Sequence, residues 1–420
     1  MRLITEKVNI GSGSLVIGGG SPIVVQTMCN THTDDVEGTL AQCRRMVAAG
    51  AEMIRITVPG LQDVPHIREI RERLRAEGIM VPIVADIHFS AQTAIEVARF
   101  VDKVRINPGN FHKDHQMARA KFLQLLEVCK AHGTAIRIGI NHGSLGEYIT
   151  NLYGNTPQAM AEAAMEWVRM CVQADFRKVV ISLKSSNTAS MVQGYRALVQ
   201  MMKAEGVVFP LHVGVTEAGG GDSGRIKSCV GIATLLEEGI GDTVRVSLTE
   251  DPVNELPVAR YLAARYSSAP MPQLPERELK MLDAACTWGP KLLRHEVDSI
   301  EEEMDPYLRD EIMQAARRRF YKPEYIACPG CGRTMYDLQK AYREVMEKTA
   351  CFKDIVIAIM GCIVNGPGEM ADADWVYVGE GGGKVSIYKK NVPVLRHVPE
   401  DEAPDRLVAL IREDLKAQGK

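Results

Sequence analysis

The sequence lacks the features that would assign it to several special classes of protein. No apolar run reaches the ~18 residues of a membrane-spanning helix, and the N-terminus has no apolar core of signal-peptide length. The formal net charge of −3 is too small to indicate a general polyanion-binding surface. The ten cysteines are scattered apart from one CxxC, unlike a secreted disulfide framework. These absences predict a cytoplasmic protein without membrane or nucleic-acid partners.

What the sequence does contain is a repeated pattern of short apolar runs, and its 420 residues allow two or three domains. Helix-like segments such as SAQTAIEVARFV separate the runs. Strand then helix, repeated eight times, predicts an α/β fold with a (β/α)8 TIM-type barrel. A doubly wound sheet is the competitor, but it would favour a glycine-rich dinucleotide fingerprint, which is missing. The runs are IVVQTM from Ile23, MIRITVP from Met53, VPIVADIHF from Val81, KVRINPG from Lys103, AIRIGIN from Ala135, KVVISLKSS from Lys178, PLHVGVTEAG from Pro210 and TVRVSLTED from Thr243.

Within these runs, aliphatic and polar side chains alternate. Neighbouring side chains of a strand face opposite ways, so Ile54 and Ile56 share one face and Arg55 and Thr57 the other. The aliphatic face should pack on the surrounding helices, which directs the polar face into the barrel. The cations placed there are Arg55, Arg105, Arg137, Lys184 and Arg245.

Only two carboxylates, Asp86 and Glu217, are offered near the same strand ends. Internal salt bridging explains any single pair, but two carboxylates do not neutralise five cations. Because uncompensated buried charges are costly, the cavity is predicted to bind a multiply charged anion, and a diphosphate suits guanidinium donors. Further hydrogen bonds are expected from neutral groups, each of which could also be an ordinary interior polar residue: His88, Asn141, Thr216 and Ser247.

The rhythm of strand and helix changes near residue 251. We expect the substrate-binding barrel at 1–252, a linker or reduced helical insert at 253–323, and a small α/β iron–sulfur-type domain at 324–420. The proline-rich YLAARYSSAPMPQLPERE indicates a linker. The charged HEVDSIEEEMDPYLRDEIMQAARRRF is typical of a solvated spacer helix. The last domain should contain the strands IVIAIMGC and WVYVG, the hairpin KVSIYKKNVPVL and two helices.

Three cysteines of this last domain, Cys328, Cys331 and Cys362, could share one metal site. A CxxC alone is compatible with zinc, a redox dithiol or an iron–sulfur centre. Cys351 begins the strand that Cys362 ends, so it is expected to be a core or surface thiol. Glu369 closes the turn CIVNGPGE and is either a fourth ligand or a surface carboxylate. A carboxylate is a weaker iron ligand than a thiolate, so this corner of a cluster would stay open to exchange.

Eight motifs together resemble the 4-hydroxy-3-methylbut-2-enyl diphosphate synthase family, iron–sulfur enzymes of the non-mevalonate (MEP) isoprenoid pathway. The resemblance covers about residues 5–250 and 325–400. It is closest to the three-domain form of the family, with a shortened insert. The motifs are VQTMCNTHTDDVEGT, VADIHF, VRINPGN, IRIGINHGSL, VTEAGG, GDTVRVSLTEDP, CPGCGRT and GCIVNGPGE.

The resemblance implies a site made from both domains. It places a [4Fe-4S] cluster on Cys328, Cys331, Cys362 and Glu369. It implies reductive ring opening and dehydration of 2-C-methyl-D-erythritol 2,4-cyclodiphosphate, with electrons from reduced ferredoxin or flavodoxin. It also implies a homodimer in which the cluster domain of one chain caps the partner's barrel. Diphosphate binding is carried over to Arg55, Arg105, Arg137, Lys184 and Arg245, and other pocket positions to Asp86, His88, Asn141, Thr216, Glu217 and Ser247.

Within this reading, Glu217 is our hypothesis for the proton donor to the departing hydroxide, because it lies inside the predicted cavity. Two rivals stay open at this point. One is a barrel enzyme for a phosphorylated substrate with a structural zinc module. The other is a zinc-ribbon binding protein with a degenerate barrel, which fits less well because five inward cations need a ligand.

Overall fold

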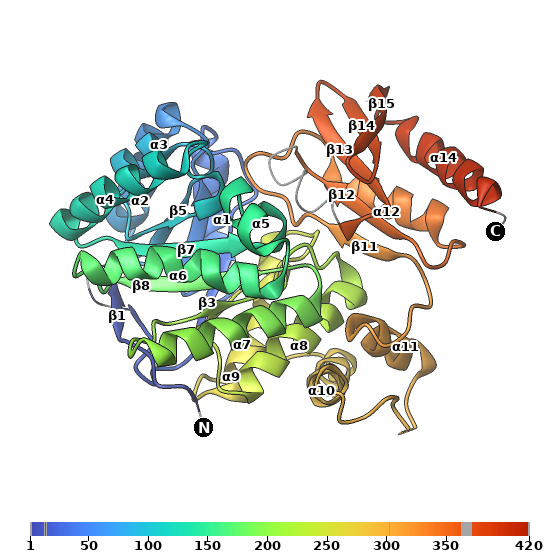
Figure 1. Ribbon diagram of the computed structural model, residues 1–420, viewed down its shortest axis with the longest axis horizontal. Helices are drawn as coiled ribbons and strands as arrows, with labels where there is room; N and C mark the ends of the chain where they lie inside the picture. The colour runs from blue at the N-terminus through green and yellow to red at the C-terminus, as the bar shows by residue number, and fades with distance from the viewer. Residues whose placement is uncertain (1, 12, 14, 302, 363–371, 419–420) are drawn as a thin grey trace.

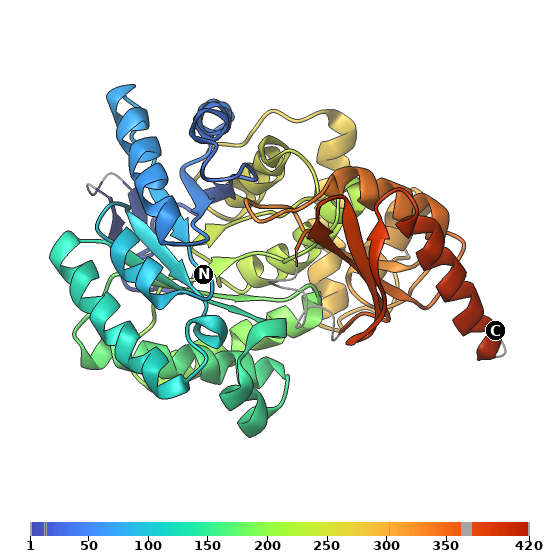
Figure 2. The same cartoon turned by 90° about the horizontal axis from the view of Figure 1, so that it is seen from above.

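The computed structural model describes residues 2–11, 13, 15–301, 303–362 and 372–418. A large lobe of alternating strands and helices holds the N-terminal part of the chain, and a smaller sheet domain lies beside it (Figure 1). The same two parts are seen side by side from above in Figure 2. None of the described helices has the length and apolar character of a membrane-spanning segment.

The large lobe is an eight-stranded parallel barrel, as the alternating runs predict. The strands follow the order β8-β7-β6-β5-β4-β3-β10-β9, and a parallel bridge between Ile181 and Leu211 joins the two ends. Each expected run contributes one strand. The strands are β3 Val24–Met28, β4 Met53–Thr57, β5 Ile83–Asp86, β6 Lys103–Ile106, β7 Ala135–Asn141, β8 Val179–Lys184, β9 His212–Val213 and β10 Thr243–Val244.

Helices follow the strands and cover the aliphatic side of the barrel. Ile54, Ile56 and Ile136 are almost fully buried in the core that these helices share with the strands. Several helices begin at a polar residue, such as Asp114 and Asn187, whose side chain accepts a hydrogen bond from a backbone N–H of the first turn. The helices are α1 Val36–Ala48, α2 Val64–Ala76, α3 Ala91–Val97, α4 His115–His132, α5 Glu147–Tyr153, α6 Pro157–Gln173, α7 Thr188–Ala204, α8 Gly221–Glu237 and α9 Glu255–Tyr266.

A short hairpin closes the N-terminal end of the barrel. It consists of β1 (Val8–Ile10) and β2 (Leu15–Ile17), which pair antiparallel. Its side chains form one apolar cluster with the first residues of the barrel strands, including Val24, Met53 and Val84. Because this end is plugged by apolar side chains, the polar interior is left to the C-terminal ends of the strands, where barrel enzymes hold their active sites.

The region after the barrel strands is more closely packed than the sequence indicates. Helix α9 lies beyond residue 252, and it contacts β3 and β10 of the barrel. Helix α10 (Glu276–Leu293) packs along α8. The solvated spacer helix expected over residues 295–320 is corrected: among the described residues of this segment, the helix is confined to α11 (Pro306–Ala315). It starts there because Asp305 caps it and Pro306 suits the first turn, and its Ile312 is fully buried against the barrel side.

We expect the substitution Gly289→Ala to destabilise the protein by about 1–3 kcal/mol, the usual cost of overpacking. A Cβ at Gly289 would lie 2.9 Å from the Cα of Val230, so α10 would have to move away from α8. The measurement is chemical denaturation. Gly194→Ala in α7 is the matched control, because its Cβ would meet its nearest neighbour at 3.5 Å. Equal stability of the two variants would show that α10 is not held against α8.

The C-terminal domain is a five-stranded mixed sheet with order β11-β12-β13-β14-β15. Strands β11 to β13 are parallel and β13 to β15 antiparallel. Two helices, which contact each other, share a core with the sheet. The expected strands, hairpin and helices are all present, and β11 is additional. The elements are β11 Glu324–Ala327, α12 Leu338–Thr349, β12 Val356–Met360, β13 Trp375–Gly381, β14 Lys384–Lys389, β15 Val392–Pro399 and α14 Ala403–Ala417.

Candidate functional site

A polar cavity lies at the C-terminal ends of the barrel strands, and the C-terminal domain of the same chain forms part of its wall. All ten residues proposed from the sequence for substrate binding line it, together with Glu217 and two of the three cysteines. The lining residues are Met28, Arg55, Asp86, His88, Arg105, Arg137, Asn141, Ser182, Lys184, Thr216, Glu217, Arg245, Ser247, Cys328, Pro329, Gly330, Cys331 and Arg333.

Asp86 is the main counter-charge inside the cavity. Its carboxylate lies 2.8 Å from the Arg55 guanidinium and 3.1 Å from that of Arg105. Burial alone would raise the pKa of Asp86, but Arg55 and Arg105 help to hold it well below its ordinary value. Gly139 makes room for this arrangement, since a Cβ there would lie 2.5 Å from Nε of Arg105.

A third buried carboxylate, Glu255 at the start of α9, was not predicted from the sequence. It lies 3.0 Å from Arg245 and is almost fully buried. Glu255 directly follows a short 3-10 turn and lies outside the expected barrel. No sequence pattern therefore indicated that its side chain would face the interior. The interior salt bridging considered for single pairs is therefore present for Arg55, Arg105 and Arg245.

Arg137 and Lys184 form no ion pair with any residue that the structure describes. Arg137 is 1% exposed, and its Nε and Nη1 have no hydrogen-bond partner among the described atoms. Burial lowers the pKa of Arg137 and of Lys184 well below their ordinary values, and the neighbouring cations act in the same direction. The cavity therefore has an excess of positive charge that an anion would relieve.

His88 is a neutral hydrogen-bonding group in this cavity. Burial lowers its pKa to about 3, Arg333 and Arg105 add to the effect, and Asp86 opposes it. Its Nε2 lies 2.6 Å from Arg105 Nη1, so the neutral ring accepts a hydrogen bond there. Its Nδ1 faces the side-chain amide of Asn110 at 3.1 Å.

We expect His88 to make the folded protein less stable as the pH falls from about 6.5 toward about 3. The folded-state pKa lies below the unfolded value, so in this window the unfolded chain binds the additional proton and unfolding is favoured. The measurement is the free energy of unfolding against pH for the wild type and for His88→Asn. The variant should lose part of this acid sensitivity, and parallel curves would contradict the expectation.

Glu217 is held in the cavity by an unusual backbone conformation. It is 1% exposed, and its φ of 52° lies in the left-handed region that non-glycine residues seldom adopt. Its carbonyl oxygen accepts a hydrogen bond from the N–H of Ala327 at 3.1 Å, and Ala218 forms a parallel bridge with Ala327. The C-terminal domain thus fixes the loop that carries this carboxylate.

The CxxC loop faces the same cavity. The N–H of Gly330 points at Sγ of Cys328 at 3.4 Å, and Nη1 of Arg333 lies 4.0 Å from Sγ of Cys331. Gly330 has a φ of 81°, which glycine adopts without strain. Burial raises the pKa of Cys328, and the neighbouring Cys331, Glu217 and Cys362 raise it further. Thiolates gathered at this point would therefore need a bound cation.

These thiols fit an iron–sulfur group in their chemistry, because N–H and guanidinium donors directed at sulfur are the contacts that such clusters receive. Glu369, the predicted fourth ligand, lies outside the described residues. Among the described residues, no group of three or more His, Cys, Asp and Glu side chains is arranged to hold a metal ion. The four-ligand set therefore stays a prediction.

Two other cysteines stand where a ligand role is unsupported. Cys351 is exposed, in line with its expectation as a core or surface thiol. Cys29 directly follows β3 but is not among the residues that line the cavity, and it is buried with its Sγ 3.7 Å from that of Cys43.

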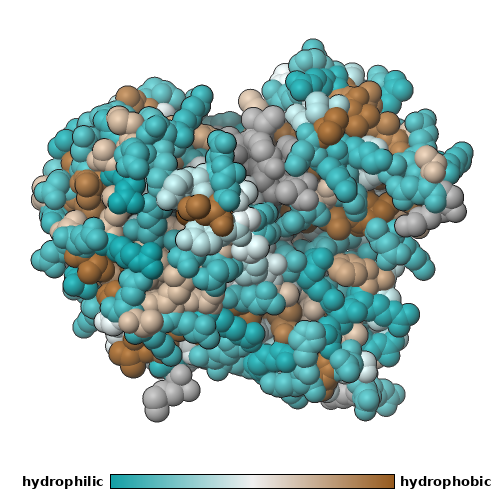
Figure 3. All heavy atoms as spheres, in the orientation of Figure 1, coloured by the Kyte–Doolittle hydropathy of each residue, from teal (hydrophilic) through white to brown (hydrophobic). Residues whose placement is uncertain are grey.

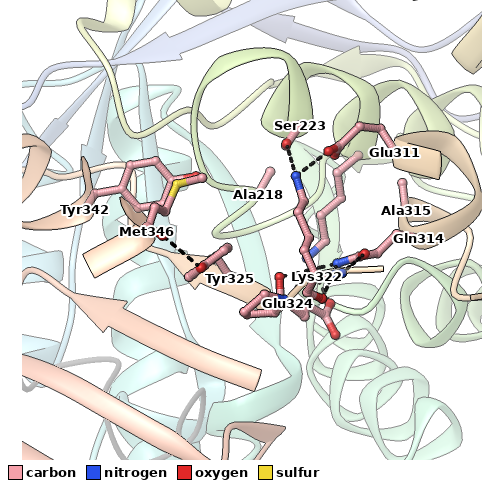
Figure 4. Close-up of a pocket in the computed structure, with 12 residues that line it drawn as sticks. Ala218, Ser223, Glu311, Gln314, Ala315, Lys322, Glu324, Tyr325, Tyr342 and Met346 are labelled. Carbon is pink, nitrogen blue, oxygen red and sulfur yellow. Dashed lines mark hydrogen bonds and ion pairs between the residues drawn. The ribbon is translucent and has the colours of Figure 1, made fainter. Parts of the chain in front are cut away.

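The C-terminal domain is attached to its own barrel through a junction that also includes α11 (Figure 4). Lys322 reaches between Ser223 of the barrel and Glu311 of α11. Glu324 lies 3.2 Å from Lys227 of α8 and 2.8 Å from Arg317. In the space-filling view the two lobes meet below a notch, and hydrophilic side chains predominate on the face shown (Figure 3). In this structure the C-terminal domain lies over the barrel of its own chain, because the loop from Cys328 to Arg333 lines the barrel cavity.

Comparison with known proteins gives two matches that together cover most of the chain. A family model described as the GcpE TIM-barrel domain matches residues 5–260, and one described as the GcpE protein C-terminal domain matches residues 324–413. The chain also has a weak structural match to a dihydropteroate synthase from Yersinia pestis, with 16% identity, a TM-score of 0.42 and coverage of 62% of this chain and 99% of that one. Similarity at that level indicates nothing about function.

Curated relatives of two kinds are similar over nearly the whole chain. The 4-hydroxy-3-methylbut-2-en-1-yl diphosphate synthase (ferredoxin) of Synechococcus sp. (strain CC9311) is 41% identical over 431 residues, covering 98% of this chain and 95% of the relative. The corresponding flavodoxin protein of Phocaeicola vulgatus is 33% identical over 601 residues, covering 98% of each chain.

The longer alignment exceeds the 420 residues of this chain. The Phocaeicola relative therefore carries a long segment without a counterpart here, as a shortened insert predicts. The matched family domains, the near-complete coverage and the cavity shared by cations and cysteines agree, and the chain belongs to the GcpE family of 4-hydroxy-3-methylbut-2-en-1-yl diphosphate synthases.

Proposed function

We propose that this chain converts 2-C-methyl-D-erythritol 2,4-cyclodiphosphate into (E)-4-hydroxy-3-methylbut-2-enyl diphosphate, the reaction of its family in the non-mevalonate pathway. Two electrons and two protons enter, the ring is opened, and one water molecule leaves. The single observation that carries this proposal is the imbalance of charge in one cavity. Six cationic side chains line it, including Arg333, against three carboxylates at Asp86, Glu217 and Glu255.

The cations are proposed to hold the diphosphate. Arg137 and Lys184 have no carboxylate partner among the described residues, so they are the groups with most to gain from phosphate oxygens. Arg55, Arg105 and Arg245 would each contact both the substrate phosphates and their present carboxylate partners. Fork-shaped guanidinium groups suit such oxygens and would fix the ring in one orientation. Neutral hydrogen bonds would come from His88, Asn141, Thr216 and Ser247.

The proposed cluster ligands are Cys328, Cys331, Cys362 and Glu369. A [4Fe-4S] cluster bound there would supply the two electrons, one at a time. The chain's own residues would bring the substrate against this loop, since Cys328 and Cys331 line the same cavity as the cations. Glu217 is the proposed proton donor to the departing hydroxide, because it is buried at the wall between the two domains.

The physiological electron donor is proposed to be reduced ferredoxin or flavodoxin, the two proteins named for the relatives. We also propose a cytoplasmic location, where the thiols would stay reduced. The division into a barrel at 1–252, an insert at 253–323 and a cluster domain at 324–420 stays a proposal; the family model of the C-terminal domain starts at 324, whereas that of the barrel runs on to 260. Helix α9 belongs to the barrel by its contacts.

Anaerobic conversion of the cyclodiphosphate with a chemical reductant, scored by product mass, tests the proposed function. We expect brown protein containing iron and a product that has lost one oxygen atom and gained no phosphate. A colourless protein that contains zinc and shows no redox turnover would instead support the barrel enzyme with a structural zinc module.

The predicted homodimer needs a test that separates two ways of capping the barrel. The contact of Glu324 with Lys227 and the bridge between Ala218 and Ala327 support capping within one chain, whereas the family resemblance implies capping by the partner. Co-expression of Glu217→Gln with Cys331→Ser decides between them, because a mixed dimer regains one intact site only if capping is exchanged. We expect no activity above that of the single variants. Sedimentation gives the number of chains, and recovered activity would establish capping by the partner.

A further inference from the structure

Arg333 is a residue that the sequence did not single out, and it joins the two halves of the site. It belongs to the C-terminal domain, two residues after Cys331, but its side chain reaches the barrel. Nη1 lies 3.4 Å from the Asp86 carboxylate, and Nη2 donates to the Asp86 carbonyl oxygen at 3.3 Å. The same guanidinium lies 4.0 Å from Sγ of Cys331. Its side chain is 11% exposed, so these contacts are largely shielded from water.

The loop that carries Arg333 has little freedom to move on its own. A Cβ at Gly332 would lie 2.7 Å from the carbonyl oxygen of Thr31, so the loop backbone sits directly on the barrel rim. The start of the loop is also held on the barrel, because the carbonyl oxygen of Cys328 accepts a hydrogen bond from the Thr249 hydroxyl at 3.1 Å. The loop therefore presents Arg333 to Asp86 from one direction, and a change at Asp86 reaches the loop through Arg333.

Asp86 is shared among three guanidinium groups. Arg55 lies 2.8 Å away, Arg105 3.1 Å and Arg333 3.4 Å. All three line the cavity, but Arg55 and Arg105 lie on barrel strands beside the other cations, where phosphate oxygens would compete with Asp86 for them. When an anion binds Arg55 and Arg105, Asp86 interacts more weakly with these two residues. Its contact with Arg333, the longest of the three, should then become shorter.

We propose that Arg333 is a positioning residue that couples filling of the anion site to the docking of the 328–333 loop, with Asp86 as the link between them. The proposal rests on the proposed function for its natural ligand, but its physical basis is any anion that engages Arg55 and Arg105. Coupling of this kind is reciprocal: docking of the loop strengthens anion binding by the same factor. The charge of Arg333 near Cys331 should also raise the reduction potential of a cluster bound there.

The test compares Arg333→Met with the wild type as anaerobically prepared, cluster-loaded protein. Hydrogen exchange of residues 328–335 is measured with and without the cyclodiphosphate, and separately with inorganic diphosphate. In the wild type, either anion should increase protection of the loop. In Arg333→Met this increase should vanish, the affinity for cyclodiphosphate should fall at least about fivefold, and the midpoint potential should become more negative.

Three variants complete the experiment. Arg343→Met removes an exposed arginine of α12 and should change none of these quantities. Arg333→Lys keeps the positive charge but lacks the paired N–H donors of a guanidinium. Its midpoint potential should therefore be closer to the wild-type value than its anion-induced protection of the loop. In the Asp86→Asn background, Arg333→Met should have no further effect on affinity, because its route to the anion is already removed. Thermal melts confirm that each variant is folded.

Each other outcome rejects a definite statement. Anion-induced protection that persists in Arg333→Met overturns the coupling. A loss of affinity that is equally large in the Asp86→Asn background shows that Arg333 binds the anion directly, and the positioning role is then wrong. A wild type that binds inorganic diphosphate with loop protection, but neither binds nor converts the cyclodiphosphate, rejects the proposed function and leaves the coupling standing.

Discussion

Replacing Glu217 by glutamine is expected to lower turnover by about 10²–10⁴-fold, the usual contribution of a positioned general acid. Glutamine keeps the size of the side chain and its hydrogen-bonding oxygen but has no proton to give to a departing hydroxide. Substrate affinity should be nearly unchanged, since the binding charge comes from the cations. Glu217 has a left-handed backbone conformation and is buried at the wall between the domains, and glutamine leaves both undisturbed.

The measurement is anaerobic single-turnover product formation, with calorimetry for substrate binding. Glu250→Gln is the control, because Glu250 is paired with Arg225 at 2.7 Å outside the cavity. It should retain turnover. If Glu217→Gln also turns over normally, the proton comes from another group. If it loses substrate binding instead, Glu217 holds the substrate and the assignment as proton donor is wrong.

Replacing Arg137 by methionine is expected to change stability and binding in opposite directions. Arg137 is 1% exposed with no ion pair among the described residues, and burial together with Arg55 and Arg105 lowers its pKa well below its ordinary value. Methionine removes this uncompensated charge, so the substrate-free protein should gain about 1–4 kcal/mol in unfolding free energy. Loss of a charged hydrogen bond to phosphate should weaken substrate binding by about 10–100-fold.

Unfolding is followed by denaturant titration with and without the cyclodiphosphate. The wild type should gain stability on binding and overtake the variant at high substrate concentration. Arg177→Met serves as the control, because its side chain is 48% exposed on the loop before β8 and should affect neither quantity. A variant that is less stable than the wild type in the absence of substrate would show that the buried charge is already compensated.

Alternation along single strands was enough to predict which side chains share the cavity. In β4 and β7 the aliphatic residues face the helices, and Arg55, Arg137 and Asn141 face inward. This works because the side-chain period of a strand is two residues whatever the rest of the chain does. The number of strands likewise followed from the eight runs, since each parallel strand needs its own crossover helix.

Charge pairing could not be predicted in the same way. Glu255 lies on a helix after the last strand, yet it pairs with Arg245, and Arg333 comes from another domain to reach Asp86. Both contacts join residues from separate elements, so the periodicity of side chains along a single strand or helix does not predict them. The charged segment near residue 300 was predicted as a solvated helix, but part of it is buried because α11 meets α8.

The amino-acid order by itself determined the barrel, its inward ring of cations and the family, because these depend on local periodicity and on short motifs that each strand or loop carries within it. Only the folded chain decided which charges neutralise each other, and that the thiol loop of this chain lies over its own barrel. Electrostatic energy depends on distance through space, and distances between separate elements are settled only when the helices, the sheet domain and the barrel pack together.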